Sequence, residues 1–212
     1  MDQLFLLAVI TVAIVLVFDY TNGFHDAANI VATVIASRAM TPVQAVVIVG
    51  VFEFLGPLLG GTAVADTIGK FVMLDGVAPL LSLSILLCGL IGAIAWNLVT
   101  WYFGIPSSSS HALVGGLIGA VVVSAGTEHV VWGFAELRNG HLTGIVKVLA
   151  ALVLSPLIGF WVGFLIHRLL NALLMAANPA ANARLRGLQF VTAAGLAFAH
   201  GANDAQKSMG IL

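Results

Sequence analysis

The sequence has few charged residues and a single cysteine. Of its 212 residues, 8% are charged and 60% are hydrophobic, and the formal net charge is −1. Soluble domains carry about 25% charged residues, so this composition excludes an ordinary soluble domain and indicates an integral membrane protein in contact with the lipid bilayer. The absence of a basic block excludes a nucleic-acid partner. The lone cysteine, Cys88, excludes an internal disulfide.

Long apolar stretches follow one another with short loops between them. A membrane crossing takes about 20 residues, and at that length the sequence predicts about six crossings. They span residues 4–36, 43–65, 77–103, 107–126, 144–170 and 188–212. The expected fold class is an all-α polytopic membrane protein. Because no loop is long enough for a soluble domain, we expect the function to be carried out in or across the bilayer.

The basic residues predict an orientation. If residues 4–36 cross the membrane once, four arginines share one side and three basic residues share the other. The four are Arg38, Arg168, Arg184 and Arg186, and the three are Lys70, Arg138 and Lys147. Cytoplasmic loops carry an excess of Lys and Arg, so the N-terminus is expected to be external and the loop at 171–187 to be cytoplasmic.

A short motif occurs twice. The stretch GFHDA at 23–27 is similar to GANDA at 201–205, and each copy follows a long apolar run. If five crossings separate the copies, the second enters from the opposite side of the membrane, as in an inverted-repeat transporter. We therefore expect residues 1–187 to form a first repeat with its linker, and residues 188–212 to begin a second.

The last residues, QKSMGIL, lie inside an apolar span. This predicts that the chain is a C-terminally truncated piece of a longer protein, which would not transport by itself. A homodimer is the other way to supply the missing half of an inverted repeat.

Polar side chains within the spans are the candidate functional groups, since each costs a few kcal/mol to place in lipid. The acids are Asp19, Asp26, Glu53 and Asp204. Lys207 follows Asp204 by three residues, and its simplest role is to neutralise that acid.

Three polar residues share one face of the first predicted helix. They are Asn22, Asp26 and Asn29, at spacings of four and three. The Asn22-Gly23 pair favours a break in this helix, which would expose backbone carbonyls to a cation. Carboxylate, amide and carbonyl oxygens suit Na⁺, Mg²⁺ or a proton. The alternative is a polar seam that only holds helices together.

A run of four serines lies in the stretch GIPSSSSHALVGG, residues 104–116. Pro106 suits a helix start, and serine is a good N-cap. Four hydroxyls beside unpaired backbone N–H groups at the positive end of a helix dipole predict an oxyanion site at Ser107, Ser108, Ser109 and Ser110. His111, one turn into the helix, could donate a further hydrogen bond. Ordinary capping with small-residue packing is the alternative.

Four function classes are compatible with these groups. A secondary transporter that couples an oxyanion to a cation uses both constellations. An intramembrane hydrolase lacks a nucleophile turn such as Gly-x-Ser-x-Gly. A divalent-metal transporter leaves the four serines unexplained, and a passive channel leaves the paired acids unexplained.

Three stretches together resemble the inorganic phosphate transporter (PiT) family, in particular its bacterial low-affinity branch. They are NGFHDAANIVATVIASRAM, WNLVTWYFGIPSSSSHALVGGLIGA and AFAHGANDAQKSMG. The resemblance implies an inverted repeat with broken helices in the cell (inner) membrane, phosphate held at the serine-bearing helix start, and coupling cations near the two signatures. It implies no enzymatic activity and no cofactor.

Carried over by position, the resemblance assigns the coupling ion to residues of both signatures and to Glu53, which matches an acidic position seen in parts of the family. These are Asn22, His25, Asp26, Asn29, Glu53, Asn203, Asp204 and Gln206, with Na⁺, where it is used, at Asp26, Asn29 and Asp204. One departure is His25, which stands where many members have asparagine. It puts sodium coupling in doubt and resembles the proton-coupled type, in which a divalent metal travels with phosphate as a neutral complex. Transport of sulfate or of a divalent metal alone stays open.

Overall fold

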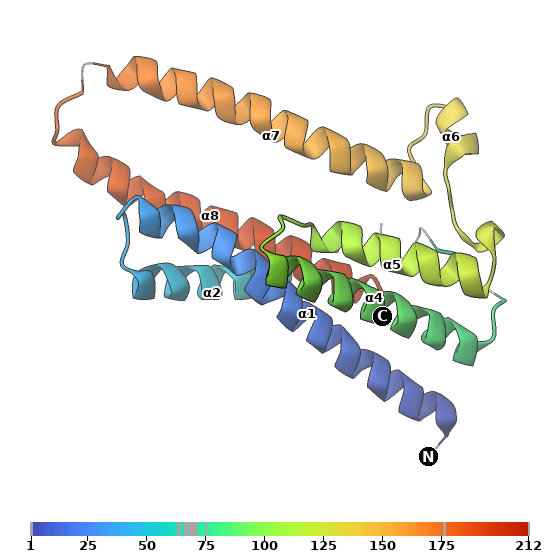
Figure 1. Ribbon diagram of the computed structural model, residues 1–212. Coiled ribbons are helices and arrows are strands. Elements are labelled where there is room, and N and C mark those ends of the chain that lie inside the picture. The colour runs from blue at the N-terminus through green and yellow to red at the C-terminus, as the bar shows by residue number, and fades with distance from the viewer. Residues whose placement is uncertain (1, 63–64, 66–71, 75, 176, 212) are drawn as a thin grey trace.

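The computed structural model describes residues 2–62, 65, 72–74, 76–175 and 177–211, and within these it leaves out the side chains of Ala27 and Asn29. The expected orientation therefore rests in part on Lys70, which lies outside the described residues. The chain is built from helices (Figure 1). They are α1 (Gln3–Ala36), α2 (Pro42–Leu59), α4 (Pro79–Phe103), α5 (Ser109–Ser124), the 3₁₀ turn η1 (Thr127–His129), α6 (Phe134–Arg138), α7 (Gly144–Leu174) and α8 (Ala181–Met209).

The all-helical membrane fold expected from the sequence is confirmed, and each of the six apolar stretches contains a helix. In the described part of the chain, four helices are long and apolar enough to cross a membrane: α1, α2, α4 and α7. α5 is shorter, with 16 residues, and α8 carries many polar side chains along its second half. The count of six crossings stays a prediction.

The break expected at Asn22-Gly23 is absent, and in this respect the prediction was wrong. α1 continues through both residues as one helix of 34 residues. The physical reason is that the Asn22 amide donates a hydrogen bond to Asp204 on α8 and therefore does not compete for its own backbone. A glycine inside a helix costs only about 1 kcal/mol relative to alanine. The chain interrupts its helices instead between α4 and α5.

α4 and α5 form an antiparallel hairpin (Figure 1). Gly104, with φ of +63°, ends α4 in a left-handed conformation that glycine adopts without strain. The two helices pack so closely that a Cβ on Gly116 would clash with the backbone carbonyl of Gly89. Leu90 and Leu113 are fully buried in the core that this hairpin shares with α1. The hairpin thereby returns the serine-bearing start of α5 to the middle of α1.

α2 packs on α8 through glycines. A Cβ on Gly56 would meet the backbone of Phe198 and Ala202, and a Cβ on Gly201 would meet the backbone of Glu53. Without side chains at these points the two helix backbones come into contact, as small residues allow in membrane proteins. This contact places Glu53 of α2 beside the second signature on α8.

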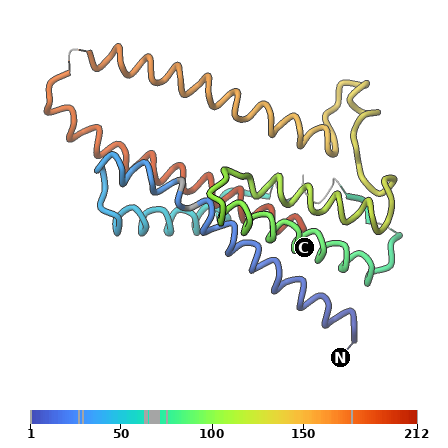
Figure 2. Tube along the Cα trace, in the orientation of Figure 1, coloured from blue at the N-terminus to red at the C-terminus, as the bar shows by residue number. Residues whose placement is uncertain are grey.

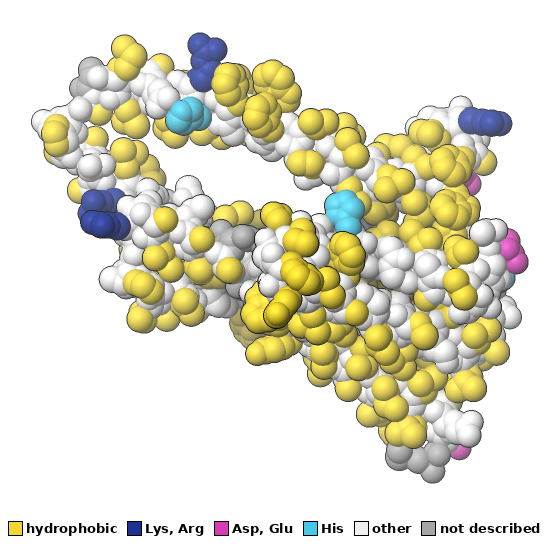
Figure 3. Space-filling view, in the orientation of Figure 1, with side chains coloured by type: hydrophobic (Ala, Val, Ile, Leu, Met, Phe, Trp, Pro, Cys, Tyr) yellow, Lys and Arg dark blue, Asp and Glu magenta, His cyan; other side chains and the backbone are white. Residues whose placement is uncertain are grey.

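α7 lies apart from the other long helices in the tube view (Figure 2). None of its most apolar 18-residue window is buried, and no charged residue occurs between Lys147 and Arg168, which is typical of a membrane span. The space-filling view shows an apolar surface over most of the visible face (Figure 3). Such a surface suits lipid or further helices.

The close contact of α2 with α8 gives a stability test. Gly201→Ala should lower stability by roughly 1–3 kcal/mol, because the new methyl group overlaps the Glu53 backbone, which cannot move aside as a side chain can. Gly195→Ala on the same helix is the matched control, because a Cβ there meets nothing within 4 Å. The measurement is thermal unfolding in detergent. Equal melting temperatures for the two variants would contradict this packing.

Candidate functional site: a polar cluster between the two signatures

The two copies of the repeated motif meet in the middle of the molecule. α1 and α8 run in opposite directions (Figure 1), and the Nδ2 of Asn22 donates to Oδ2 of Asp204 at 2.7 Å. Asn22 is only 2% exposed. Opposite helix directions agree with an inverted repeat, although the division of the chain into two repeats stays a prediction.

His200 joins carboxylates from three helices. Its Nδ1 lies 3.0 Å from Oε1 of Glu53 on α2. Its Nε2 lies 3.3 Å from Oδ2 of Asp204, one turn along α8, and 3.8 Å from Oδ2 of Asp26 on α1. On the other side of Asp26, Nδ1 of His25 lies 3.1 Å from Oδ1. Three acids that the sequence places in separate spans therefore form one cluster.

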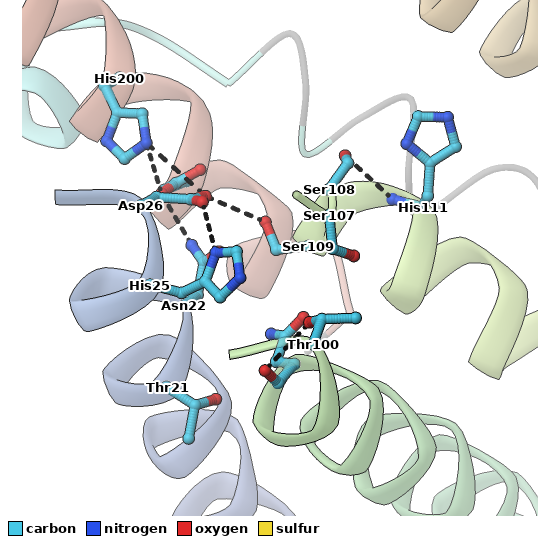
Figure 4. A network of polar contacts seen from close by, with 12 residues as sticks. Thr21, Asn22, His25, Asp26, Thr100, Ser107, Ser108, Ser109, His111 and His200 are labelled. Carbon is cyan, nitrogen blue, oxygen red and sulfur yellow. Dashed lines mark hydrogen bonds and ion pairs between the residues drawn. The ribbon is translucent and has the colours of Figure 1, made fainter. Parts of the chain in front are cut away.

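The start of α5 lies against this cluster (Figure 4). Ser108 is the N-cap, and its hydroxyl accepts a hydrogen bond from the backbone N–H of His111. Ser109 is 3% exposed, and its hydroxyl lies 3.4 Å from Oδ2 of Asp26, to which it donates. Ser107 accepts from the indole N–H of Trp96 at 2.9 Å. The predicted helix start at the serines is therefore confirmed, and it lies beside the first signature.

Other predicted residues are placed less centrally. Ser110 is half-buried, and the imidazole of His111 is exposed and lies on the far side of Ser108 from Asp26 in Figure 4. Asn203 is exposed and donates to the carbonyl of Ala199 in its own helix. Gln206 is buried in α8, and the side chain of Asn29 lies outside the described residues.

Three further residues join the cluster, and the sequence reasoning did not assign them to the site. His200 is one. Lys207 is the second, with Nζ 2.6 Å from Oδ1 of Asp204, and Ser208 is the third, with a hydroxyl that donates to Asp19. Helical spacing is the signal that could have found them. His200 lies four residues before Asp204, Lys207 three after it and Ser208 four after it, so all three share its face of the helix.

Two cavities border the cluster. One, of about 220 Å³, is lined by acids and their partners from α1, α2 and α8, among them Asp19, Asn22, Glu53, His200 and Asp204. The other, of about 260 Å³, lies between α1 and the α4–α5 turn and is lined by His25, Thr100, Pro106 and Ser107 among others. A small ion could therefore approach the acids on one side and the serines on the other.

The cluster has the donor set of a cation site. One ligand atom each from Asp26, His200 and Asp204 lie within 4.8 Å of one another. Carboxylate oxygens suit Na⁺ and harder divalent ions, and an imidazole nitrogen suits a proton or a transition metal. Two of the three residues expected to hold Na⁺, Asp26 and Asp204, are thus brought together.

The sequence matches the phosphate transporter family over residues 22–186. The chain belongs to this family. Among the curated proteins it is similar to a "probable low-affinity inorganic phosphate transporter" of Bacillus subtilis (strain 168), with 41% identity over 213 residues that cover 100% of this chain and 60% of the relative. A protein of the same description from Streptomyces halstedii is 43% identical over 92% of this chain and 86% of its own length.

One more distant relative agrees with this membership, and one solved structure shares the fold. The low-affinity inorganic phosphate transporter PitB of Escherichia coli (strain K12) is 36% identical over 98% of this chain and 45% of its own length. A solved structure described as the sodium-dependent phosphate transporter superposes with a TM-score of 0.78 over 97% of this chain and 66% of that one, at 22% identity. At that identity the likeness shows the fold alone. The chain spans about 60% of the Bacillus subtilis relative.

The hydrogen bond between Asn22 and Asp204 allows a prediction about the stability of the protein. Asn22→Leu should destabilise the protein by about 1 kcal/mol, because the largely buried carboxylate of Asp204 loses a hydrogen-bond donor, while removal of the unpaired Oδ1 of Asn22 offsets part of that loss. Asn203→Leu is the control, since Asn203 is exposed and contacts only its own helix. Thermal unfolding of both variants in detergent measures the difference. If Asn203→Leu proves to be the more damaging change, the signatures do not meet as described.

Proposed function

We propose that the protein is a secondary transporter that moves inorganic phosphate across the cell membrane, coupled to a cation. Membership of the phosphate transporter family supports the substrate. The observation that carries the proposal is the contact of Ser109 with Asp26, because it joins a helix start suited to an anion to a cluster suited to a cation. The intramembrane hydrolase is not favoured, since no described serine hydroxyl hydrogen-bonds a histidine ring.

Phosphate would bind at the start of α5. The first backbone N–H groups of a helix have no carbonyl partner within the helix, and the helix dipole adds a partial positive charge there. Ser107, Ser108, Ser109 and Ser110 would add hydroxyl donors around them. His111 would support the helix start rather than bind phosphate itself, because its backbone N–H donates to Ser108 and its ring lies away from Asp26 (Figure 4).

The coupling cation would bind between the signatures. Asp26, Glu53 and Asp204 supply carboxylates, and Oδ1 of Asn22 is buried without a hydrogen-bond partner in the described structure. An unpaired buried acceptor costs about 1–3 kcal/mol, and a bound cation near it would remove that cost.

We propose the proton as the coupling ion. Both ring nitrogens of His200 point at carboxylate oxygens, and both contacts are hydrogen bonds only when the ring carries two protons. His25 adds a second titratable ring beside Asp26. Na⁺ at Asp26 and Asp204, with Asn29, is the other candidate, and a divalent metal would travel as part of the cargo in a neutral metal-phosphate complex.

Alternating access would follow from charge neutralisation. Charged groups inside a membrane are costly to move through an apolar barrier. When the cation binds at Asp26 and Asp204, it neutralises negative charge on these side chains, and the barrier to the opposite-facing state falls with it. In the orientation that we propose, the N-terminus is external and the cell membrane is the location.

The coupling proposal is tested by uptake of radiolabelled phosphate into liposomes that contain the full-length gene product. An inward proton gradient should drive uptake above equilibrium, and Asp26→Asn should abolish this drive, because the amide cannot exchange a proton. Glu136→Gln, at an exposed acid of α6, should leave it unchanged. If a sodium gradient drives uptake and a proton gradient does not, Na⁺ replaces the proton; uptake that ignores both gradients would remove coupling altogether.

The phosphate site is tested at the buried serine of α5. Ser109→Ala should raise the KM for phosphate at least about tenfold, because a hydrogen bond to a charged group is worth roughly 1.5–3 kcal/mol. Ser124→Ala, at the exposed end of the same helix, is the control. Unlabelled sulfate added as competitor decides between the two tetrahedral oxyanions. Stronger competition by sulfate than by phosphate would reassign the substrate, and an unchanged KM in Ser109→Ala would reject the site.

A further inference from the structure

Lys207 is the one lysine or arginine in the described part of the chain that is buried, with 9% of its surface exposed. A buried ammonium is costly unless it is paired. Its first partner is Oδ1 of Asp204, at 2.6 Å. Its second is the hydroxyl of Ser109, at 3.4 Å, to which the ammonium donates. One side chain thus connects the second signature with the start of α5.

The start of α5 is short of positive charge. Its serines are neutral donors, and the nearest charged group to Ser109 besides Lys207 is the carboxylate of Asp26. Phosphate is an anion near neutral pH, so repulsion from Asp26 would oppose its binding unless a cation stands close by. Lysine acts as a point charge at phosphate sites, and its flexible stem allows its head to move.

Among the described residues, the partners of Lys207 leave it a donor for a ligand. An ammonium carries three N–H groups, and contacts to Asp204 and Ser109 account for two. The acids near it come from two helices: Asp204 on α8, and Asp19 and Asp26 on α1. Its strongest contact is with Asp204, which is also the acid that we assign to the coupling cation.

We propose that Lys207 is a phosphate-binding residue that exchanges partners during coupling. Without a cation at Asp204, that carboxylate holds the ammonium. When the coupling cation binds Asp204, the ammonium turns toward the anion at Ser109, so cation binding strengthens phosphate binding. This inference rests on the proposed function. The competing role is that of a counter-ion that only neutralises Asp204.

Equilibrium binding of radiolabelled phosphate to the full-length gene product in lipid nanodiscs distinguishes the two roles. Asp204→Asn releases Lys207 permanently and should bind phosphate as tightly as the unaltered protein or more tightly. Asp204→Asn with Lys207→Gln removes both charges together, which avoids leaving a buried carboxylate unpaired. That double variant should bind phosphate at least about tenfold more weakly than Asp204→Asn, the usual effect of losing a charged hydrogen bond. Arg184→Gln, at an exposed arginine of the same helix, should bind like the unaltered protein.

Weaker phosphate binding by Asp204→Asn than by the unaltered protein would overturn the exchange of partners. A double variant that binds as tightly as Asp204→Asn would show that Lys207 is only a counter-ion, and the inference would fail while the proposed function stands. If the unaltered protein itself binds no phosphate, the proposed function fails, and the inference falls with it.

Discussion

Burial of ionisable side chains among apolar helices is the constraint on which the structure depends. In such surroundings a lone carboxylate is expensive, so each acid must find a donor. Asp204 accepts from Asn22 and Lys207 and lies 3.3 Å from Nε2 of His200. Asp26 accepts from Ser109 and lies 3.1 Å from Nδ1 of His25. These contacts hold α1, α8 and the start of α5 together. In the function that we propose, the same side chains bind the cation and the anion.

The backbone makes this convergence possible through glycine. Glu53 reaches His200 because α2 and α8 touch at Gly56 and Gly201. The start of α5 reaches Asp26 because α4 and α5 close into a hairpin in which Gly89 and Gly116 touch. The polar cluster and the glycine contacts are therefore parts of one arrangement, and a methyl group at either contact would separate the acids from their partners.

The same contacts suggest how an anion site and a cation site could be coupled. Ser109 touches both an acid of the first signature and the lysine of the second. Lys207 contacts both Asp204 and Ser109. A change of charge at Asp204 would therefore alter the hydrogen bonding at the start of α5 through this one side chain. Coupling of this kind needs only a redistribution of hydrogen bonds within a cluster a few ångströms across.

The sequence by itself determined the helical membrane fold, the helix start within the run of four serines and the kinds of side chain in the candidate site. These follow from composition, apolar run length and local capping, which act between near neighbours. It wrongly predicted a break at Asn22-Gly23, because the partner that occupies the Asn22 amide lies 182 residues away. Only the tertiary structure brought His200 and Lys207 into the cluster and turned Asn203 outward, since the face that a helix turns to its neighbours depends on how the whole bundle packs.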